Sequence, residues 1–211
     1  MNNLTAIQFP EFPVPQNSDL HQRMQFLVEI EKLKLIYRQN VVVDGSRAEN
    51  SAEHSWHIAL MAILLLPHSD HAGIDLLRVV KMLLIHDIVE IDVGDTFLYD
   101  QEANKTKAGK EMKSAERIFG LLPAAQGDEF RELWSEFERR DTPDARYAAA
   151  LDGMQPLVNH YASKGLGITK HGLKVQQIID KKKYIATASL ELWEYSLTII
   201  DKSKNMGLYL P

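Results

Sequence analysis

The sequence predicts an all-helical fold, and three observations support that prediction. Apolar residues recur at helical spacing through several long segments. No segment alternates apolar and polar residues for long enough to indicate a sheet, and no internal repeat is present. With 211 residues, 45% of them hydrophobic, the chain can bury one substantial core and needs no second domain. We therefore expect a single all-α domain over residues 1–211, folded as a compact helical bundle.

The first two predicted helices follow a proline-rich arm at residues 1–18. The arm has no basic start and prolines break its apolar residues, so it is not a secretory signal. Residues 17–19 offer an N-cap for an amphipathic helix from Leu20 to near Arg38. Asn50 then begins the cap of a second helix, which ends at Pro67.

The later helices are predicted from apolar periodicity and from breaks in it. Residues 94–106 are polar and are expected to form a loop. Gly165 and Gly167 break the chain before a last long helix, whose apolar stripe is either core packing or a dimer seam. That stripe consists of Ile178, Ile185, Leu192, Tyr195 and Ile199. The predicted helical ranges are 74–91, 107–122, 127–140, 144–162 and 171–205.

The chemically informative residues begin with His86 and Asp87. They lie within an apolar run, residues 81–91, that has no proline or glycine and is long enough for a buried helix. An unpaired carboxylate in such a setting must shift its pKa or find a cation. On a helix, Glu90 lies one turn after His86 on the same face, with Asp87 beside them. The three side chains can therefore converge on one cation, with Glu90 just outside the ligands and holding a water.

Two further polar residues occur in similar apolar helical stretches. His54 opens one stretch, and Asp152 lies within another. Nitrogen and carboxylate ligands suit a divalent transition metal, and the chain contains no cysteine that could supply a thiolate. The spacing therefore favours a metal site. In the alternative, His86 is a hydrogen-bonded core residue, and Asp87 and Glu90 lie on a solvated helix face.

The segments around these residues resemble the HD-domain metal-dependent phosphohydrolases. The segments EHSW, HDIVEIDVGD and LDGMQPL are most similar to the branch that includes bacterial 5'-deoxynucleotidases. The resemblance covers residues 33–161 and implies an HD-domain helical bundle. It also implies a metal held by His54, His86, Asp87 and Asp152, an acid/base pair of Glu90 and Asp95, and a phosphate-binding Arg38.

Further positions bear on the substrate and on the surroundings of the metal. Gln39 stands where that branch tends to have an aromatic residue, and residues 96–99 stand where it usually has a proline. Because of these departures, the sequence does not establish that the substrate is a nucleotide. Arg47 could bind an anionic group of the substrate, or pair with Glu49 on the surface. His57 is expected to pack or to support the site rather than bind the metal.

The sequence thus predicts a metal-dependent hydrolase of small phosphate esters, and the resemblance implies a nucleoside 5'-monophosphate as substrate. One divalent ion, drawn from Mn, Co, Fe, Ni, Zn or Mg, activates the attacking water and polarises the ester. Glu90 takes or orients the proton of that water, and Asp95 protonates the leaving oxygen. Arg38 clamps the phosphate oxygens.

Two alternatives stay open at the level of sequence. A two-metal phosphodiesterase or a di-iron oxygenase needs extra histidine ligands, yet no histidine occurs between Asp87 and Asp152. His57 or His160 could still supply an extra ligand, so this class of enzyme is not excluded. The other alternative is a non-catalytic nucleotide-sensing module, although every residue that the resemblance implies is present.

Composition limits the partners. The net charge of −5 argues against a nucleic-acid polymer, since phosphate backbones are bound by clustered lysine and arginine. The one dense basic run, residues 181–183, is expected to be a solvated helix face. The longest apolar run, residues 58–66, is far shorter than a membrane span of about 20 residues. We therefore expect a soluble, cytoplasmic protein that acts on a small phosphorylated substrate, and we leave a homodimer open.

Overall fold

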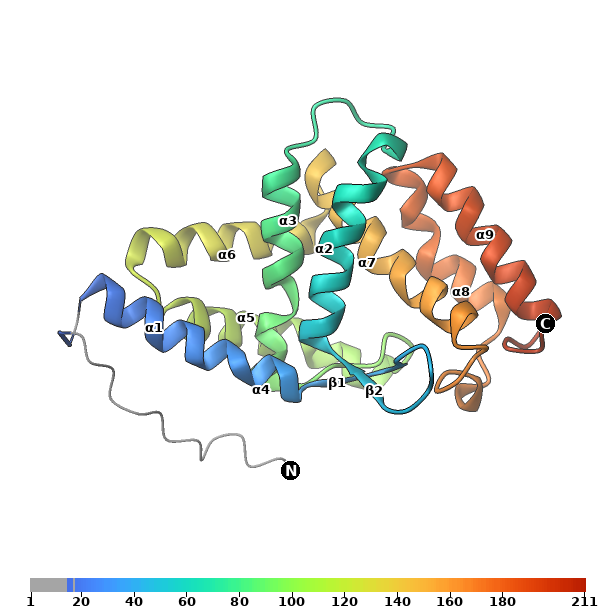
Figure 1. Ribbon diagram of the computed structural model, residues 1–211, viewed down its shortest axis with the longest axis horizontal. Coiled ribbons are helices and arrows are strands. Elements are labelled where there is room, and N and C mark those ends of the chain that lie inside the picture. Colours follow the sequence, from blue (N-terminus) through green and yellow to red (C-terminus); the bar gives the residue numbers. More distant parts are fainter. Residues whose placement is uncertain (1–14, 17) are drawn as a thin grey trace.

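Helices form most of the computed structural model, which confirms the all-helical prediction (Figure 1). The structure describes residues 15, 16 and 18–211, without the side chains of residues 101–104. The proline-rich arm predicted for residues 1–18 lies almost entirely outside the described residues. No described helix is long and apolar enough to cross a membrane.

The element order is a run of α-helices with one strand pair near the start. The α-helices are α1 (Asp19–Glu29), α2 (Ser51–Leu65), α3 (Leu76–Ile85), α4 (Glu90–Val93), α5 (Gln101–Phe119), α6 (Ala124–Arg139), α7 (Pro143–Ala162), α8 (Val175–Lys182) and α9 (Leu190–Asn205). The strands are β1 (Tyr37–Val41) and β2 (Ala48–Asn50). Short 3₁₀ helices lie at Ile30–Leu35, Leu66–His68, His86–Val89, Thr169–His171 and Lys183–Thr187.

The core is organised by α2, α3 and α7, which pack against one another (Figure 1). As predicted, Asn50 caps α2: its side chain accepts a hydrogen bond from Glu53 N at 2.9 Å, and the Glu53 carboxylate accepts one from Asn50 N. In α7 the fully buried alanines 148–150 let neighbouring helices approach closely. The buried Tyr147 hydroxyl donates to Ala62 O at 3.0 Å and so ties α7 to α2.

The first helix is shorter than predicted, and a hairpin follows it. α1 and its 3₁₀ extension end at Leu35, and β1 pairs with β2 in an antiparallel hairpin. The strands have five and three residues, which is too short for a clear alternating pattern. Gly45 supplies the turn between them, with a φ of 72°. Arg38 therefore lies on a strand, not at the end of a helix.

The helix predicted for residues 74–91 changes its winding at His86. α3 ends at Ile85, residues 86–89 form a 3₁₀ helix, and α4 continues to Val93. In a 3₁₀ helix, residues three apart are eclipsed, so Asp87 and Glu90 share a face. The predicted loop after Gly94 is also shorter than expected, because α5 already begins at Gln101.

The long C-terminal helix predicted for residues 171–205 is divided. α8 passes through a 3₁₀ segment, and Ser189 begins α9 by accepting a hydrogen bond from Leu192 N. The predicted apolar stripe is buried in the core except for Tyr195, which is 57% exposed. Lys182 lies on that stripe and is buried, so the prediction of a solvated face for residues 181–183 was wrong for this lysine.

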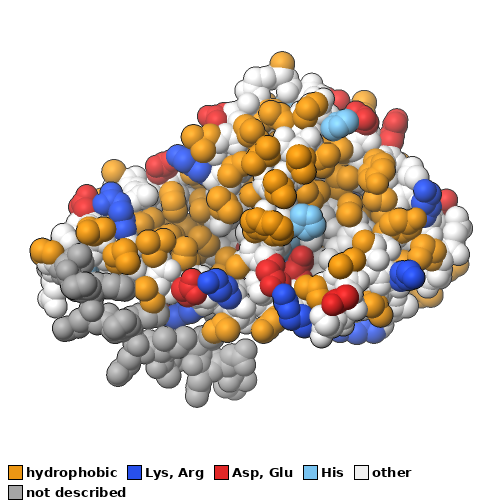
Figure 2. Space-filling model, in the orientation of Figure 1, with side chains coloured by type: hydrophobic (Ala, Val, Ile, Leu, Met, Phe, Trp, Pro, Cys, Tyr) orange, Lys and Arg blue, Asp and Glu red, His pale blue; other side chains and the backbone are white. Residues whose placement is uncertain are grey.

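Exposed apolar side chains gather on the outer face of α2 and α3 (Figure 2). These side chains are Trp56, Leu60, Ile63 and Leu64 on α2 and Leu77 and Leu84 on α3. A contiguous apolar area of this kind is typical of a contact surface.

Near the C-terminal end of α7, His160 is buried as a neutral side chain. Its Nε2 lies 2.7 Å from Asn40 Oδ1 and its Nδ1 lies 3.2 Å from the Tyr209 hydroxyl. A ring that donates to the amide oxygen and accepts from the hydroxyl satisfies both atoms without a charge. Burial, with a contribution from the nearby charge of Lys182, lowers the pKa of His160 to about 3.

We predict that His160 makes stability fall in mild acid. The unfolded chain protonates this histidine near its ordinary pKa of about 6.5, whereas the folded chain resists protonation until about pH 3. Stability present above pH 6.5 is therefore lost as the pH falls, by about 1.4 kcal/mol per pH unit. Denaturant unfolding at several pH values should show a shallower acid loss in His160→Gln than in the wild type. Parallel curves for the two proteins would contradict this account.

Candidate metal centre

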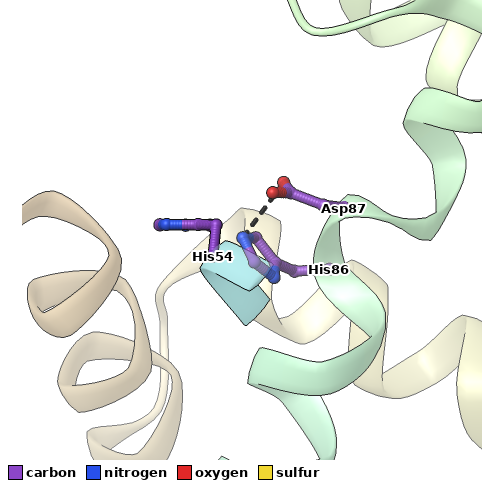
Figure 3. A group of neighbouring side chains, drawn as sticks. All are labelled: His54, His86 and Asp87. Carbon is purple, nitrogen blue, oxygen red and sulfur yellow. Dashed lines mark ion pairs between the residues drawn. The ribbon is translucent and has the colours of Figure 1, made fainter. Parts of the chain in front are cut away.

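Metal-ligand side chains from separate elements meet at one buried point. His54 comes from the first turn of α2, and His86 and Asp87 come from the 3₁₀ segment after α3 (Figure 3). One ligand atom from each of these residues lies within 4.8 Å of the other two, and all three residues are buried.

Asp152 joins this cluster from α7. Its Oδ1 lies 3.0 Å from His54 Nε2 and 3.8 Å from His86 Nε2. The next turn of α7 contains Pro156, which has no N–H to offer to the main-chain carbonyl of Asp152. The structure thus brings together all four residues that the sequence analysis proposed as ligands.

The ring of His86 is oriented by the main chain. His86 Nδ1 lies 2.9 Å from Leu83 O, so Nδ1 carries a proton and Nε2 is the nitrogen left to bind a cation or a second proton. His86 Nε2 lies 3.0 Å from Asp87 Oδ1, yet it is buried without a properly oriented hydrogen bond. A buried nitrogen lone pair without a hydrogen-bond donor, facing carboxylate oxygens, fits coordination of a cation.

The ring of His54 is oriented by a chain of side chains. Gln155 donates from Nε2 to Glu49 Oε1 at 2.9 Å, which leaves its Oε1 as the acceptor for His54 Nδ1 at 3.2 Å. The Gln155 amide nitrogen also lies 3.4 Å from His57 Nδ1. His54 Nε2 is therefore free of its proton and points toward Asp152. His57 supports this arrangement from outside the cluster, as expected.

The charges of the cluster call for a cation. Burial, together with the nearby Arg38 charge, lowers the pKa of His54 to about 4, so this ring is neutral at pH 7. Burial also opposes a charge on His86, but Asp87 and Asp152 outweigh it and raise the pKa of His86 well above its ordinary value. The two carboxylates thus favour positive charge at this point, which a proton on His86 Nε2 supplies without a metal and a divalent ion would supply in its place.

Arg38 reaches the cluster from β1. Its Nη1 donates to Asp87 Oδ2 at 2.8 Å, and its Nε lies 3.7 Å from Glu49 Oε2. Arg47 does not reach the cluster: it forms a two-pronged pair with Glu53 at 2.6 and 2.9 Å on the surface. The expected pairing of Arg47 with Glu49 is corrected, because its guanidinium is paired with Glu53 instead. Its role in substrate binding stays a prediction.

The two expected acid/base carboxylates also line this region. Glu90 is buried and accepts a hydrogen bond from Ser51 Oγ at 2.8 Å. Burial raises the pKa of Glu90 well above its ordinary value, and Asp87 and Asp95 add to the effect. Burial raises the pKa of Asp95 as well, although Arg38 opposes this. Both carboxyl groups are therefore poised to exchange protons closer to neutral pH than free carboxylates.

These residues lie at a cavity of about 380 Å³, which is within the range of pockets for small ligands. Its wall is polar near the metal-ligand residues and includes Gln39 and Thr96, which depart from the expected pattern. Elsewhere it is apolar, with Leu157, Ile168, Leu173 and Ile178. The cavity can therefore hold a phosphate ester together with an organic group.

Several residues of this region were missed at the level of sequence. Gln155 follows Asp152 by three residues on a helix, so its side chain could have been placed near the site. Lys182 lies four residues after Ile178 and three before Ile185, the spacing of a buried face. No sequence pattern predicted a place for Arg140 at the cavity. It ends α6 in the left-handed conformation, so the helical spacing does not give the direction of its side chain.

The helical fold and the clustered histidines and aspartates define a metal-binding domain of the HD type. The HD domain family matches residues 30–193, and the chain belongs to this family. The human protein 5'-deoxynucleotidase HDDC2 is 31% identical over 130 residues, which span 61% of this chain and 62% of that protein. The Dictyostelium discoideum protein of the same name is 26% identical, and the matched region spans 76% of this chain and 87% of that protein.

Among solved structures, a "predicted metal-dependent phosphohydrolase" from Magnetospirillum magnetotacticum is 44% identical to this chain. It superimposes with a TM-score of 0.88, covering 94% of this chain and all of that protein. A protein from Pyrococcus horikoshii, 21% identical with a TM-score of 0.61, shares the fold.

We predict that Gln155 supports metal affinity without touching the metal. Gln155→Leu removes the acceptor that fixes the ring of His54, so the affinity for a divalent ion should fall by about 10- to 100-fold. Competition titration against a chromogenic chelator measures this change. Gln25→Leu, at an exposed position of α1, serves as the control. Wild-type affinity in Gln155→Leu would show that the orientation of His54 does not depend on this amide.

Proposed function

We propose that this protein is a metal-dependent phosphohydrolase that removes the phosphate from a small phosphorylated compound, with nucleoside 5'-monophosphates as the favoured class. The observation that carries the proposal is the convergence of four metal-ligand side chains and one arginine at a single cavity. Membership of the HD domain family and the names of the relatives support the same reaction.

In this proposal one divalent ion is held by His54, His86, Asp87 and Asp152. Nitrogen and oxygen donors of this kind suit Mn, Co, Fe, Ni or Zn, and Mg is compatible with the carboxylates. When bound, such an ion polarises a phosphoryl group and lowers the pKa of water. The whole chain, residues 1–211, is taken as one HD domain built around this ion.

Arg38 is proposed to bind the phosphate. Its Nη1 donates to Asp87 and its Nε faces Glu49, while its Nη2 forms no hydrogen bond with a described residue. An arginine fork matches two oxygens of a phosphate group, and donors left free by the protein are available to them. Arg38 thus orients the scissile phosphate next to the metal ligands and neutralises part of its charge.

Glu90 and Asp95 are proposed as the proton-transfer pair. Glu90 shares a face of the 3₁₀ segment with Asp87, and Ser51 holds its carboxyl group in place. It takes the proton of the attacking water. Asp95 lines the same cavity with a raised pKa and delivers a proton to the oxygen that leaves phosphorus.

We also propose a cytoplasmic setting and a homodimer. An acidic chain without cysteine suits a reducing compartment. The exposed apolar side chains of α2 and α3 are the surface on which a second copy would pack (Figure 2).

We predict close to one metal ion per chain and phosphatase activity that depends on it. Elemental analysis gives the stoichiometry, and release of phosphate from nucleotides, sugar phosphates and dinucleotides with Mn²⁺, Co²⁺, Mg²⁺ or Zn²⁺ gives the substrate class. Asp87→Asn should lose both metal and activity, whereas Asp180→Asn, at an exposed position of α8, should keep both. Two ions per chain, or phosphate release that survives removal of the metal, would reject the proposal.

We predict that Glu90→Gln slows catalysis but keeps the metal. The amide has nearly the same shape but cannot accept a proton, so kcat should fall by about 10²- to 10⁴-fold. Metal content should match the wild type, since the four ligands are unchanged. Glu116→Gln, at an exposed position of α5, is the matched control. Loss of the metal in Glu90→Gln would instead make Glu90 a ligand.

We predict that Arg38→Lys weakens phosphate binding although it keeps the charge. Lysine lacks the planar fork, so kcat/KM should fall at least about tenfold with unchanged metal content. Arg47→Lys, outside the cavity, should behave as the wild type. Equal kinetics for Arg38→Lys and the wild type would move the phosphate contact to another residue.

A further inference from the structure

Lys182 is a buried cation on the wall of the cavity that contains the metal-ligand residues. It is the last residue of α8 and is 6% exposed. It lines the cavity with Asp152 and Arg38, but no described residue forms a hydrogen bond or an ion pair with it. A cation that faces a cavity and has no partner among the described residues indicates a place where an anion binds.

Arg140 provides a second cation on the same wall. It ends α6 in the left-handed conformation, and its guanidinium carbon lies 4.2 Å from the centroid of the Tyr184 ring. The described residues offer it no carboxylate at ion-pair distance, and it lines the cavity. Tyr184 also takes part in a side-chain hydrogen bond with Arg140. A guanidinium has five N–H groups, so donors are left for a further acceptor.

This wall is fixed relative to the metal-ligand residues. Tyr184 packs against the main chain at Gly153, where a Cβ atom would collide with its hydroxyl and would lie 2.9 Å from its Cζ. Gly153 directly follows Asp152, so the ring beneath Arg140 is placed by the residue next to a metal ligand. Ile178 and Ile185, both buried, hold the backbone on either side of Lys182.

The charge of Lys182 is consistent with an anion-binding role. Burial lowers its pKa to about 8; Asp152 opposes the shift, while Arg38 and Arg140 add to it. The side chain therefore keeps its proton at pH 7. A bound anion would relieve the mutual repulsion of these cations.

We propose that Lys182 and Arg140 bind a second anionic group of the substrate. The preferred substrates are then phosphomonoesters that carry another phosphate or a carboxylate. This inference rests on the proposed function, since it places the scissile phosphate beside Arg38 and Asp87. A cavity of about 380 Å³ has room for both anionic groups and an organic part between them.

The test compares substrates that differ by one anionic group. For the wild type, we expect KM to be at least about tenfold lower for deoxyadenosine 3',5'-bisphosphate than for deoxyadenosine 5'-monophosphate. The pair 3-phosphoglycerate and glycerol 3-phosphate tests a carboxylate in the same way. In Lys182→Met, an apolar chain of similar length, the ratio of KM values within each pair should approach one. Arg140→Met should reduce the ratio in the same direction. Lys183→Met, at the exposed neighbouring lysine, should keep the wild-type ratio.

Two outcomes overturn the inference. Equal KM values within both pairs in the wild type would show that no second anion is bound. An equal rise of KM for both members of a pair in Lys182→Met would show that this lysine contacts the scissile phosphate instead. If no compound is hydrolysed, the proposed function fails. The inference is then tested by calorimetry: the Kd of the wild type should be at least about tenfold lower for the member of each pair with the second anionic group. Equal Kd values within both pairs, or a ratio of Kd values that is unchanged in Lys182→Met, would overturn the inference.

Discussion

The structure depends on two carboxylates that lie beside two imidazole rings. Asp87 is buried and the side chain of Asp152 is 23% exposed at the cavity, and their charge requires a positive partner within a few ångströms. His54 and His86 present lone pairs to the same point. The requirement links α2, the 3₁₀ segment after α3, and α7, so a bound cation would stabilise the packing of these elements.

The surrounding residues fix the orientation of the two imidazole rings in this cluster. Glu49 fixes the amide of Gln155, the amide fixes His54, and a main-chain carbonyl fixes His86. Each link is short and buried, so a change in one side chain alters the ring that it orients. Arg38 connects the same cluster to the hairpin. The site is thus specified by a network several residues wider than its ligands.

Much of the fold and of the site could be predicted from the sequence, and the remainder has physical causes. The cap at Asn50 and the apolar stretches around His54, Asp87 and Asp152 are local patterns, and the structure brings these three residues together as expected. The β-hairpin and the 3₁₀ turn at His86 are set by tertiary packing over only a few residues, so they leave little periodic signal. Glu53 was missed as the partner of Arg47, because only the nearer Glu49 was considered for pairing. Lys182 was misassigned because a basic run was read as solvated although its spacing was that of a buried face.

The most direct test of the account is diffraction from crystals soaked with Mn²⁺, recorded so that the anomalous signal of the metal is resolved. We expect one strong peak per chain, about 2.0–2.3 Å from His54 Nε2, His86 Nε2 and a carboxylate oxygen each of Asp87 and Asp152. A peak that lies away from these four residues, or a second peak of equal strength within the cavity, would contradict it.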